Sequence, residues 1–288
     1  MEKYYRFAGV ELSVTACDTP MYEEDRSLEP FRVDTVSDPH RFTFAFVDTV
    51  TPPVGSLAAT MDNFVEYRDG DRHQRYIGAI NGNLTNAYIR AEHHGKDHRV
   101  QLKRSSYQEG LTAKTVLNAI EAEHLIARNH GFVFHCSYIE HNGKAILFTA
   151  PSETGKSTQA DLWHQYRGAE IINGDRAAIR LADGQLMAEG IPFAGSSKYC
   201  KNRSLPIEAI VYLGQAPVTT IRRMRGYESF CRIWEGVSVN TWDKEDVELV
   251  SDVVQKVAEQ IPVFHMPCTP DESAVIVLEQ ELRKLENP

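Results

Sequence analysis

In the first part of the chain, apolar residues gather in short β-rich runs that are separated by turn residues. Two such runs lie at 42–47 and 75–80. The pairs Asp69-Gly70 and Asn81-Gly82 stand between runs of this kind, and both accept the positive φ angles that tight hairpin turns require. Residues 1–108 are therefore expected to form an antiparallel, β-rich N-terminal domain.

From residue 111 the apolar positions recur at steps of three and four, which is the spacing of a helix face. These positions are Val116, Leu117, Ile120, Leu125 and Ile126. Gly131 follows as a stop signal, because glycine commonly ends helices. One helix over 111–129 is thus expected to connect the N-terminal domain to a second domain that covers 109–288.

The second domain is expected to alternate strands and helices. Apolar runs at 132–139 and 144–149 flank Asn142-Gly143 and predict a hairpin. A Gly-Lys turn follows the second run directly. The expected helices are 158–166, 227–236, 246–260 and a capped one that starts at Thr269-Pro-Asp-Glu272, and the expected strands are 170–173, 178–181, 185–188, 210–213 and 219–224.

The segment Ala150-Pro-Ser-Glu-Thr-Gly-Lys-Ser157 fits the pattern of a phosphate-binding loop between a strand and a helix. A loop that enters a helix presents unpaired backbone N–H groups at the positive end of the helix dipole, where an anion binds. Lys156 suits the outer phosphates of ATP, and the Ser157 hydroxyl suits Mg²⁺. The residues expected to bind the nucleotide are Ser152, Glu153, Thr154, Gly155, Lys156, Ser157 and Thr158.

Two further residues are candidates for the chemistry. Asp175 follows the apolar Ile171-Ile172 run and lies 18 residues beyond Ser157, where an acid at a strand end could help to hold Mg²⁺. Its alternative role is that of a turn residue beside Gly174. His135 lies in the strand before the loop and is either a core residue or a group that orients the phosphate.

Composition and charge exclude several classes of function. The formal net charge of −9 argues against a nucleic-acid binder, which needs an excess of clustered cations. The sequence contains no apolar run long enough for a membrane span and no apolar leader after Met1. Five scattered cysteines form no CxxC pair and are expected to be free thiols. A cytoplasmic protein is expected, without a membrane or nucleic-acid partner.

Two other groups of polar residues are candidates for binding sites. His93, His94 and His98 bracket Gly95-Lys96-Asp97, and a solvated hairpin tip is favoured there over a metal cluster because the spacing implies no ligand geometry. The segment 195–203 carries Lys198, Lys201 and Arg203. It is equally well read as a binding site for an anionic substrate or as a solvated basic loop.

The order of a strand with His135, a hairpin, the Gly-Lys-Ser turn, a helix and a strand that ends near Asp175 resembles the HPr kinase/phosphorylase family and its phosphoenolpyruvate carboxykinase-like relatives. The resemblance covers 130–215. It implies a carboxykinase-like P-loop domain with a mixed sheet, so the expected fold class is a mixture of α+β and α/β.

Carried over residue by residue, the resemblance makes His135 the histidine beside the phosphates, Lys156 the phosphate-binding lysine, and Ser157 a magnesium ligand. Asp175 becomes the acid that takes the proton from a substrate hydroxyl and also a magnesium ligand. The family commonly has two adjacent acids here, whereas this chain has Gly174-Asp175-Arg176. Glu189 matches the family's further magnesium-binding glutamate, with a solvated strand end as the alternative.

The N-terminal half does not resemble the usual N-terminal domain of HPr kinases. A closer resemblance is to HPr-kinase-like serine kinases that occur with modified-peptide biosynthesis, in which segments like Gly190-Ile-Pro-Phe-Ala-Gly195 are found. The expected function is an ATP- and Mg²⁺-dependent kinase that acts on a hydroxyl of a protein, peptide or small molecule. A nucleotide-sensing scaffold without phosphoryl transfer and carboxykinase-type chemistry are the alternatives, and a homo-oligomer is left open.

Overall fold

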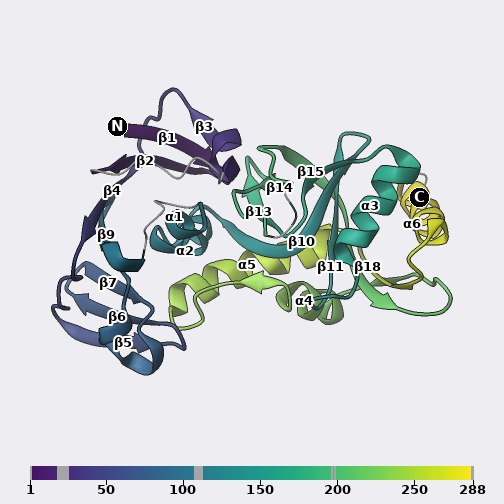
Figure 1. Ribbon diagram of the computed structural model, residues 1–288. Coiled ribbons are helices and arrows are strands. Elements are labelled where there is room, and N and C mark those ends of the chain that lie inside the picture. The colour runs from purple at the N-terminus through teal and green to yellow at the C-terminus, as the bar shows by residue number, and fades with distance from the viewer. Residues whose placement is uncertain (1, 18–25, 107–112, 196, 198, 287–288) are drawn as a thin grey trace. The chain divides into compact units, whose positions relative to one another are not determined.

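The computed structural model describes residues 2–17, 26–106, 113–195, 197 and 199–286. These residues form two compact units, Met1–Ala122 and Glu123–Pro288, and each unit contains a large mixed sheet. Figure 1 labels many of the helices and strands. No helix among the described residues combines the length and the apolar character needed to cross a lipid bilayer.

The first unit is built on a nine-stranded sheet with the order β3-β1-β2-β4-β9-β8-β7-β6-β5. Its strands are β1 (Glu2–Phe7), β2 (Val10–Ala16), β3 (Arg32–Val33), β4 (His40–Val47), β5 (Ser56–Thr60), β6 (Phe64–Asp69), β7 (Arg72–Ile77), β8 (Ile89–His94) and β9 (Asp97–Lys103). Short 3₁₀ turns η1 (Arg26–Phe31), η2 (Ile80–Gly82), η3 (Leu84–Asn86) and η4 (Arg104–Ser106) and helix α1 (Ala113–Ala119) complete the unit.

The expectation of a purely antiparallel N-terminal sheet is wrong at β4, which pairs parallel with both β2 and β9. A long connection precedes β4, and the β5–β8 strands separate it from β9, so the chain has room for both parallel pairings. Within β4, Phe42 and Phe44 are buried while Arg41 and Thr43 are exposed. This alternation fixes which face of the strand meets the core.

Of the two hairpin turns expected at Asp-Gly and Asn-Gly pairs in this unit, the structure contains one. Asp69-Gly70 closes the β6–β7 hairpin as expected, with Gly70 at φ 59°. Asn81-Gly82 lies instead in η2, within a longer connection from β7 to β8. The expected helix over 111–129 is interrupted, because Glu121 has φ 54° and separates α1 from α2 (Ala122–Arg128).

The solvated hairpin tip expected for His93, His94 and His98 is only partly correct. The β8–β9 turn does lie at Gly95 and Lys96, and His94 is exposed. His93 and His98, however, are 4% and 5% exposed. They pair across β8 and β9 on the buried face of the sheet, so they belong to the interior of the unit and not to its solvated surface.

The second unit contains the strands and helices on which the phosphate turn depends. Its strands are β10 (Gly131–His141), β11 (Lys144–Thr149), β12 (Glu170–Asn173), β13 (Arg176–Ala182), β14 (Gln185–Gly190), β15 (Ser204–Gln215), β16 (Arg222–Met224), β17 (Val237–Ser238) and β18 (Val263–Cys268). Its helices beyond α2 are α3 (Lys156–Arg167), α4 (Tyr227–Trp234), α5 (Lys244–Gln260) and α6 (Glu272–Glu286). The main strand order is β11-β10-β13-β14-β15-β18-β16, with an additional pairing of β11 and β15.

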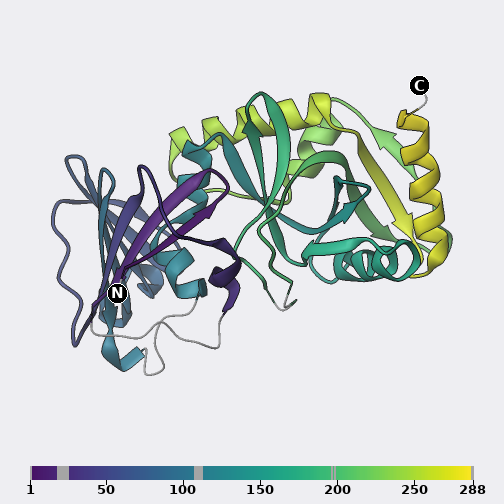
Figure 2. The same cartoon turned by 90° about the horizontal axis from the view of Figure 1, so that it is seen from above.

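Helices cover both faces of the sheet around β11. Ile146 and Phe148 pack with α3 and α6, whereas Ala145 and Leu147 pack in the core that α4 and α5 cover. The turned view separates α3 from α5 on opposite sides of the strands (Figure 2). A strand that is buried on both faces has no polar side to alternate with, which explains why 145–148 is continuously apolar. Because β11 is packed on both faces, it holds the turn that follows it in a fixed position.

Candidate functional site

The expected phosphate turn occupies the connection between β11 and α3. Glu153 has φ 64° and Gly155, the N-cap of α3, has φ 113°. No side chain caps the helix start, so the first backbone N–H groups of α3 are not satisfied by a capping residue. Ser152, Glu153, Ser157 and Thr158 are exposed, and Thr154 is half-buried. The turn thus presents an uncapped helix N-terminus to solvent, which is the local geometry that favours an anion.

Lys156 is a buried residue of this turn, with 8% of its surface exposed. Its Nζ donates hydrogen bonds to the carbonyl oxygens of Ala150 at 3.0 Å and Pro151 at 3.2 Å. Burial lowers the pKa of the ammonium group, and the charges of Cys136 and Asp175 oppose this shift. Two of its three N–H donors therefore fix the turn, and the third is available to a ligand oxygen.

His135 and Asp175 lie together beside this turn. The Nε2 of His135 is 3.8 Å from Oδ1 of Asp175, and about one third of each side chain is exposed. Burial lowers the pKa of His135, the charge of Lys156 lowers it further, and Asp175 opposes both. His135 is thus neutral near pH 7, and its charge environment includes both Lys156 and Asp175. The structure brings these three predicted residues into one site.

Asp175 is held in place by Asn173, a residue that the sequence analysis did not single out. The buried Oδ1 of Asn173 accepts hydrogen bonds from the backbone N–H groups of Asp175 at 2.9 Å and Arg176 at 3.0 Å. Its Nδ2 donates to the carbonyl of Ile191 at 3.0 Å. Asn followed by Gly at a strand end is a turn signal. The pair Asn173-Gly174 is therefore the sequence feature that could have identified Asn173.

The segment after β14 packs against Asp175. A Cβ atom on Gly195, which has φ 56°, would lie 2.5 Å from Cγ of Asp175. A Cβ atom on Gly174 would lie 2.3 Å from the Cβ of Ser197. Both contacts are shorter than real Cβ atoms tolerate, so only glycine permits this approach. The loop that contains Gly190-Ile-Pro-Phe-Ala-Gly195 thus forms one wall beside the carboxylate.

Arg176 is a second residue that the sequence analysis did not assign to the site. Its Nε lies 3.5 Å from Oδ2 of Asp175, and its Nη1 donates to Oγ of Ser238 at 3.0 Å. The guanidinium carbon lies 5.5 Å from the ring centre of Phe193. A cation is therefore fixed between Asp175 and the neighbouring loop. The sequence signal that could have identified Arg176 as a site residue is that it directly follows Asp175.

The remaining candidates have other partners. Glu189 forms an ion pair with Arg180 at 2.9 Å and accepts a hydrogen bond from Ser204 Oγ at 3.3 Å, so a metal-binding role would require competition with Arg180. Lys201 pairs with Glu170 and Arg203 pairs with Glu140, each at 2.6 Å. These two cations behave as paired surface residues, whereas Lys198 lies outside the described residues.

Comparisons with known proteins add little to this geometry. No protein-family model matches the chain, and no curated protein matches it. A search of solved structures finds, among others, the structure of the Hpr(Ser) kinase/phosphatase from Coxiella burnetii, with 10% identity and a TM-score of 0.35. That match covers 54% of this chain and 98% of the other. A likeness of this size carries no conclusion about function, so the case for activity depends on the site itself.

Proposed function

We propose that the second unit binds the phosphates of ATP at the turn 150–158 and transfers a phosphoryl group to a serine-type hydroxyl. The observation that carries this proposal is the placement of Lys156 inside an uncapped helix-start turn, with His135 and Asp175 beside it. The proposal places the reaction in the cytoplasm, where ATP is available and cysteines remain reduced. None of the five cysteines, all of which lie in the described part of the chain, forms a disulfide bond.

The phosphate-binding part of the proposal rests on unsatisfied donors. The first turn of α3 offers backbone N–H groups that no side chain caps, and Lys156 adds a cation that the loop carbonyls hold in place. These groups suit an anion with several oxygens, since each oxygen can accept from a different donor. A nucleotide triphosphate provides such oxygens in a row.

The residues also fit a magnesium ion. Ser157 is exposed in the first turn of α3, and Asp175 has a partly exposed carboxylate. Hydroxyl and carboxylate oxygens are the ligands that Mg²⁺ accepts, usually together with phosphates and water. When bound with the nucleotide, the ion would neutralise phosphate charge. We propose Ser157 and Asp175 as its protein ligands and retain Glu189 as a candidate only if it releases Arg180.

Asp175 is proposed as the base that accepts the proton of the acceptor hydroxyl. Asn173 fixes the backbone of Asp175 and leaves the carboxylate partly accessible. His135, which is neutral because its pKa is lowered, is suited to donate a hydrogen bond to a phosphoryl oxygen without adding another charge. Arg176 lies on the other side of the carboxylate and can stabilise negative charge that develops during transfer.

The direct test is phosphoryl transfer by the purified full chain. It would be incubated with Mg²⁺, γ-labelled ATP and a panel of serine-containing peptides and small hydroxyl compounds. Asp175→Asn is expected to retain ATP binding and to lower the transfer rate about 10²–10⁴-fold, the usual contribution of a positioned base. Asp183→Asn is the matched control, because Asp183 lies in the exposed β13–β14 turn.

A nucleotide-binding scaffold is the second candidate. Asp175 stands between Gly174 and Arg176, without the adjacent second acid of the resembled family, and Arg176 is already paired with it. ATP binding by the wild-type chain with neither transfer nor hydrolysis would favour the scaffold. Loss of labelled product in Asp183→Asn as well as in Asp175→Asn would contradict the assigned base.

A further inference from the structure

A buried group of histidines and acids lies in the first unit and includes none of the residues used by the proposed kinase reaction. His73 on β7 pairs with His93 on β8, and His93 pairs with His98 on β9. Directly opposed residues in neighbouring strands project from the same face of a sheet. Three imidazoles from three adjacent strands therefore form one row on one face.

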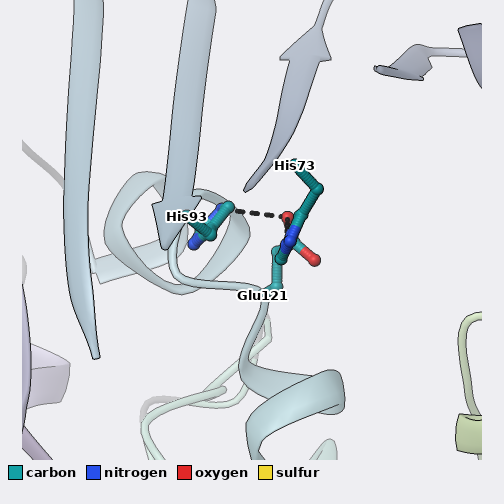
Figure 3. A group of neighbouring side chains, drawn as sticks. All are labelled: His73, His93 and Glu121. Carbon is teal, nitrogen blue, oxygen red and sulfur yellow. Dashed lines mark ion pairs between the residues drawn. The ribbon is translucent and has the colours of Figure 1, made fainter. Parts of the chain in front are cut away.

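Glu121 reaches this row from the interruption between α1 and α2. Its backbone has φ 54°, and the residue is 3% exposed. Oε1 of Glu121 lies 3.0 Å from Nε2 of His93 and 3.8 Å from Nε2 of His73. Figure 3 shows the carboxylate directed at the two imidazoles. The two nitrogens and this oxygen all lie within 4.8 Å of one another.

The facing atoms of this group lack conventional hydrogen bonds. Both Nε2 of His93 and Oε1 of Glu121 are buried without a hydrogen-bond partner, even though they are 3.0 Å apart. A buried polar atom without a partner costs about 1–3 kcal/mol. These two atoms form an ion pair without an aligned hydrogen bond, so both can turn their lone pairs to a shared cation.

The atoms of His93 and Glu121 that would not bind a metal have partners of their own, as is usual for metal-binding side chains. Nδ1 of His93 lies 2.9 Å from Nδ1 of His98, whose Nε2 lies 2.9 Å from Nδ1 of His40. A hydrogen bond at Nδ1 orients the ring and leaves Nε2 as the ligand atom. Nη2 of Arg75 lies 3.0 Å from Oε2 of Glu121 and holds the second carboxylate oxygen.

We propose that His73 Nε2, His93 Nε2 and Glu121 Oε1 bind a divalent transition-metal ion of the Zn²⁺ class. Tetrahedral ligands of zinc lie about 3.4 Å apart, given bonds of about 2.0–2.2 Å, and the separations of 3.0 and 3.8 Å between Glu121 Oε1 and the two imidazole nitrogens bracket this value. Imidazole ligands favour Zn²⁺ and its neighbours over Mg²⁺ and Ca²⁺, which prefer oxygen.

The site has three protein ligands, so a fourth position remains for water or another small ligand. His73 is 27% exposed at its side chain, whereas His93 and Glu121 are buried. The exchangeable position therefore lies on the side of His73. Arg75 does not prevent cation binding, because its charge is shared between Glu121 and Glu66, whose Oε2 accepts from Nε at 3.0 Å.

The first experiment measures metal binding by the untagged full chain. After removal of metals by a chelator, the protein would be titrated with Zn²⁺ in competition with a chromophoric chelator, and metal content would be measured by mass spectrometry after dialysis. We expect one equivalent of Zn²⁺ or Co²⁺ per chain, and no comparable binding of Mg²⁺. The absence of a stoichiometric Zn²⁺ or Co²⁺ site would overturn the proposal.

Variants then locate the site. His73→Ala is the main variant, because His73 is partly exposed and its removal disturbs the core less than removal of His93. We expect at least about a 100-fold loss of Zn²⁺ affinity, since loss of an outer partner alone costs about 10–100-fold. His94→Ala is the matched control, because His94 is exposed and is directed to the opposite face of β8. Equal affinity in a folded His73→Ala variant would overturn the assignment.

X-ray absorption of the zinc-loaded wild-type chain provides a test that needs no variant. Two imidazole ligands with oxygen in the remaining positions are expected. A sulfur ligand, or fewer than two imidazoles, would contradict the site even if His73→Ala failed to fold. None of these metal experiments measures ATP-dependent transfer. A negative result for the metal site therefore leaves the kinase proposal untouched, and the reverse also holds.

Discussion

Burial and function make opposite demands on the ammonium group of Lys156. Burial lowers its pKa, which disfavours the charged form, while a phosphate ligand requires the charge. The carbonyl oxygens of Ala150 and Pro151 accept hydrogen bonds from Nζ and so replace part of the lost hydration. The loop therefore holds a cation in position before any ligand arrives.

Replacing Lys156 with alanine is expected to weaken Mg-ATP binding at least severalfold, because both the cation and its two bonds to the turn are lost. Calorimetric titration of the full chain with Mg-ATP measures the effect. Lys244→Ala is the control, since Lys244 also lies in the first turn of a helix but is 90% exposed at its side chain. Unchanged affinity in Lys156→Ala would remove the main support for the phosphate site.

Lys156 also controls the protonation of His135. Its charge lowers the pKa of His135, second only to burial. Lys156→Met removes the charge while keeping the length of the side chain, so the pKa of His135 is expected to rise. Protonation of His135 would then begin at a higher pH than in the wild type. Titration of the His135 ring signal by NMR measures this shift. The control Lys244→Met should leave the pKa of His135 at its wild-type value. An unchanged pKa in Lys156→Met would show that Lys156 does not act on His135.

At the scale of elements, α3 begins and ends with a glycine of positive φ. Gly155 has φ 113° at the N-cap and Gly168 has φ 66° at the C-cap, and a Cβ at either position would meet no atom within 4 Å. Any substitution cost therefore comes from the backbone and not from crowding. Gly155 lies in the phosphate turn, whereas Gly168 only ends the helix.

Gly155→Ala and Gly168→Ala are each expected to destabilise the chain by about 1–2 kcal/mol, the cost of a left-handed conformation for a residue with a Cβ. Gly155→Ala should additionally weaken ATP binding, because relief of the strain reshapes the phosphate turn. Gly168→Ala should leave ATP binding unchanged. Urea unfolding and nucleotide titration of both variants provide the measurements, and equal ATP affinities would show that the turn does not depend on Gly155.

Local patterns explain which elements could be predicted from the sequence. The strand, turn and helix around Gly155 follow from a contiguous apolar run and a Gly-Lys-Ser motif, and the structure places His135 and Asp175 beside them. Asn173 and Arg176 were missed because their roles depend on contacts with Ile191 and Phe193, in a loop that lies beyond two further strands of the sequence.

The histidine row shows where local patterns fail. The turn at Gly95 was predicted correctly, but the burial of His93 and His98 depends on the strand order β4-β9-β8-β7 and on the register of each of these pairings. Strand register is set by long-range pairing and by which face is buried. Glu121 was read as part of a continuous helix, whereas its positive φ directs it toward the histidines.

At the scale of the whole molecule, the two units bury charge in different ways. In the second unit, His135, Asp175 and Arg176 are partly exposed, as expected of groups that meet a substrate. The first unit buries Glu66 and Glu121 with Arg75 between them. One guanidinium carries a single positive charge, so two ionised carboxylates beside it leave an uncompensated negative charge in a dry interior. Such a charge is removed by protonation of one acid or by a bound cation.

Glu66 is the acid on which the pH dependence of the first unit depends. Burial raises its pKa well above the ordinary value of 4.5, and the charge of Glu121 raises it further, while Arg75 opposes both. His73 lies 3.9 Å from its Oε1. Between the unfolded and folded pKa values, the folded chain keeps a proton that the unfolded chain has released. The contribution of Glu66 to stability is therefore present below pH 4.5 and is lost as the pH rises toward the folded value.

Glu66→Gln mimics the protonated acid and keeps an oxygen for Nε of Arg75, so its stability lacks this dependence. The difference in the free energy of unfolding, wild type minus Glu66→Gln, is expected to fall by about 1.4 kcal/mol as the pH rises from 5.5 to 6.5. Urea unfolding with chelator present, followed by amide exchange of the β6–β9 peptides, measures it. Glu29→Gln, at an ion-paired surface position of the same unit, is the control. A difference that stays flat or rises with pH would mean that the folded chain holds Glu66 ionised, and Arg75 would then have to compensate both carboxylates.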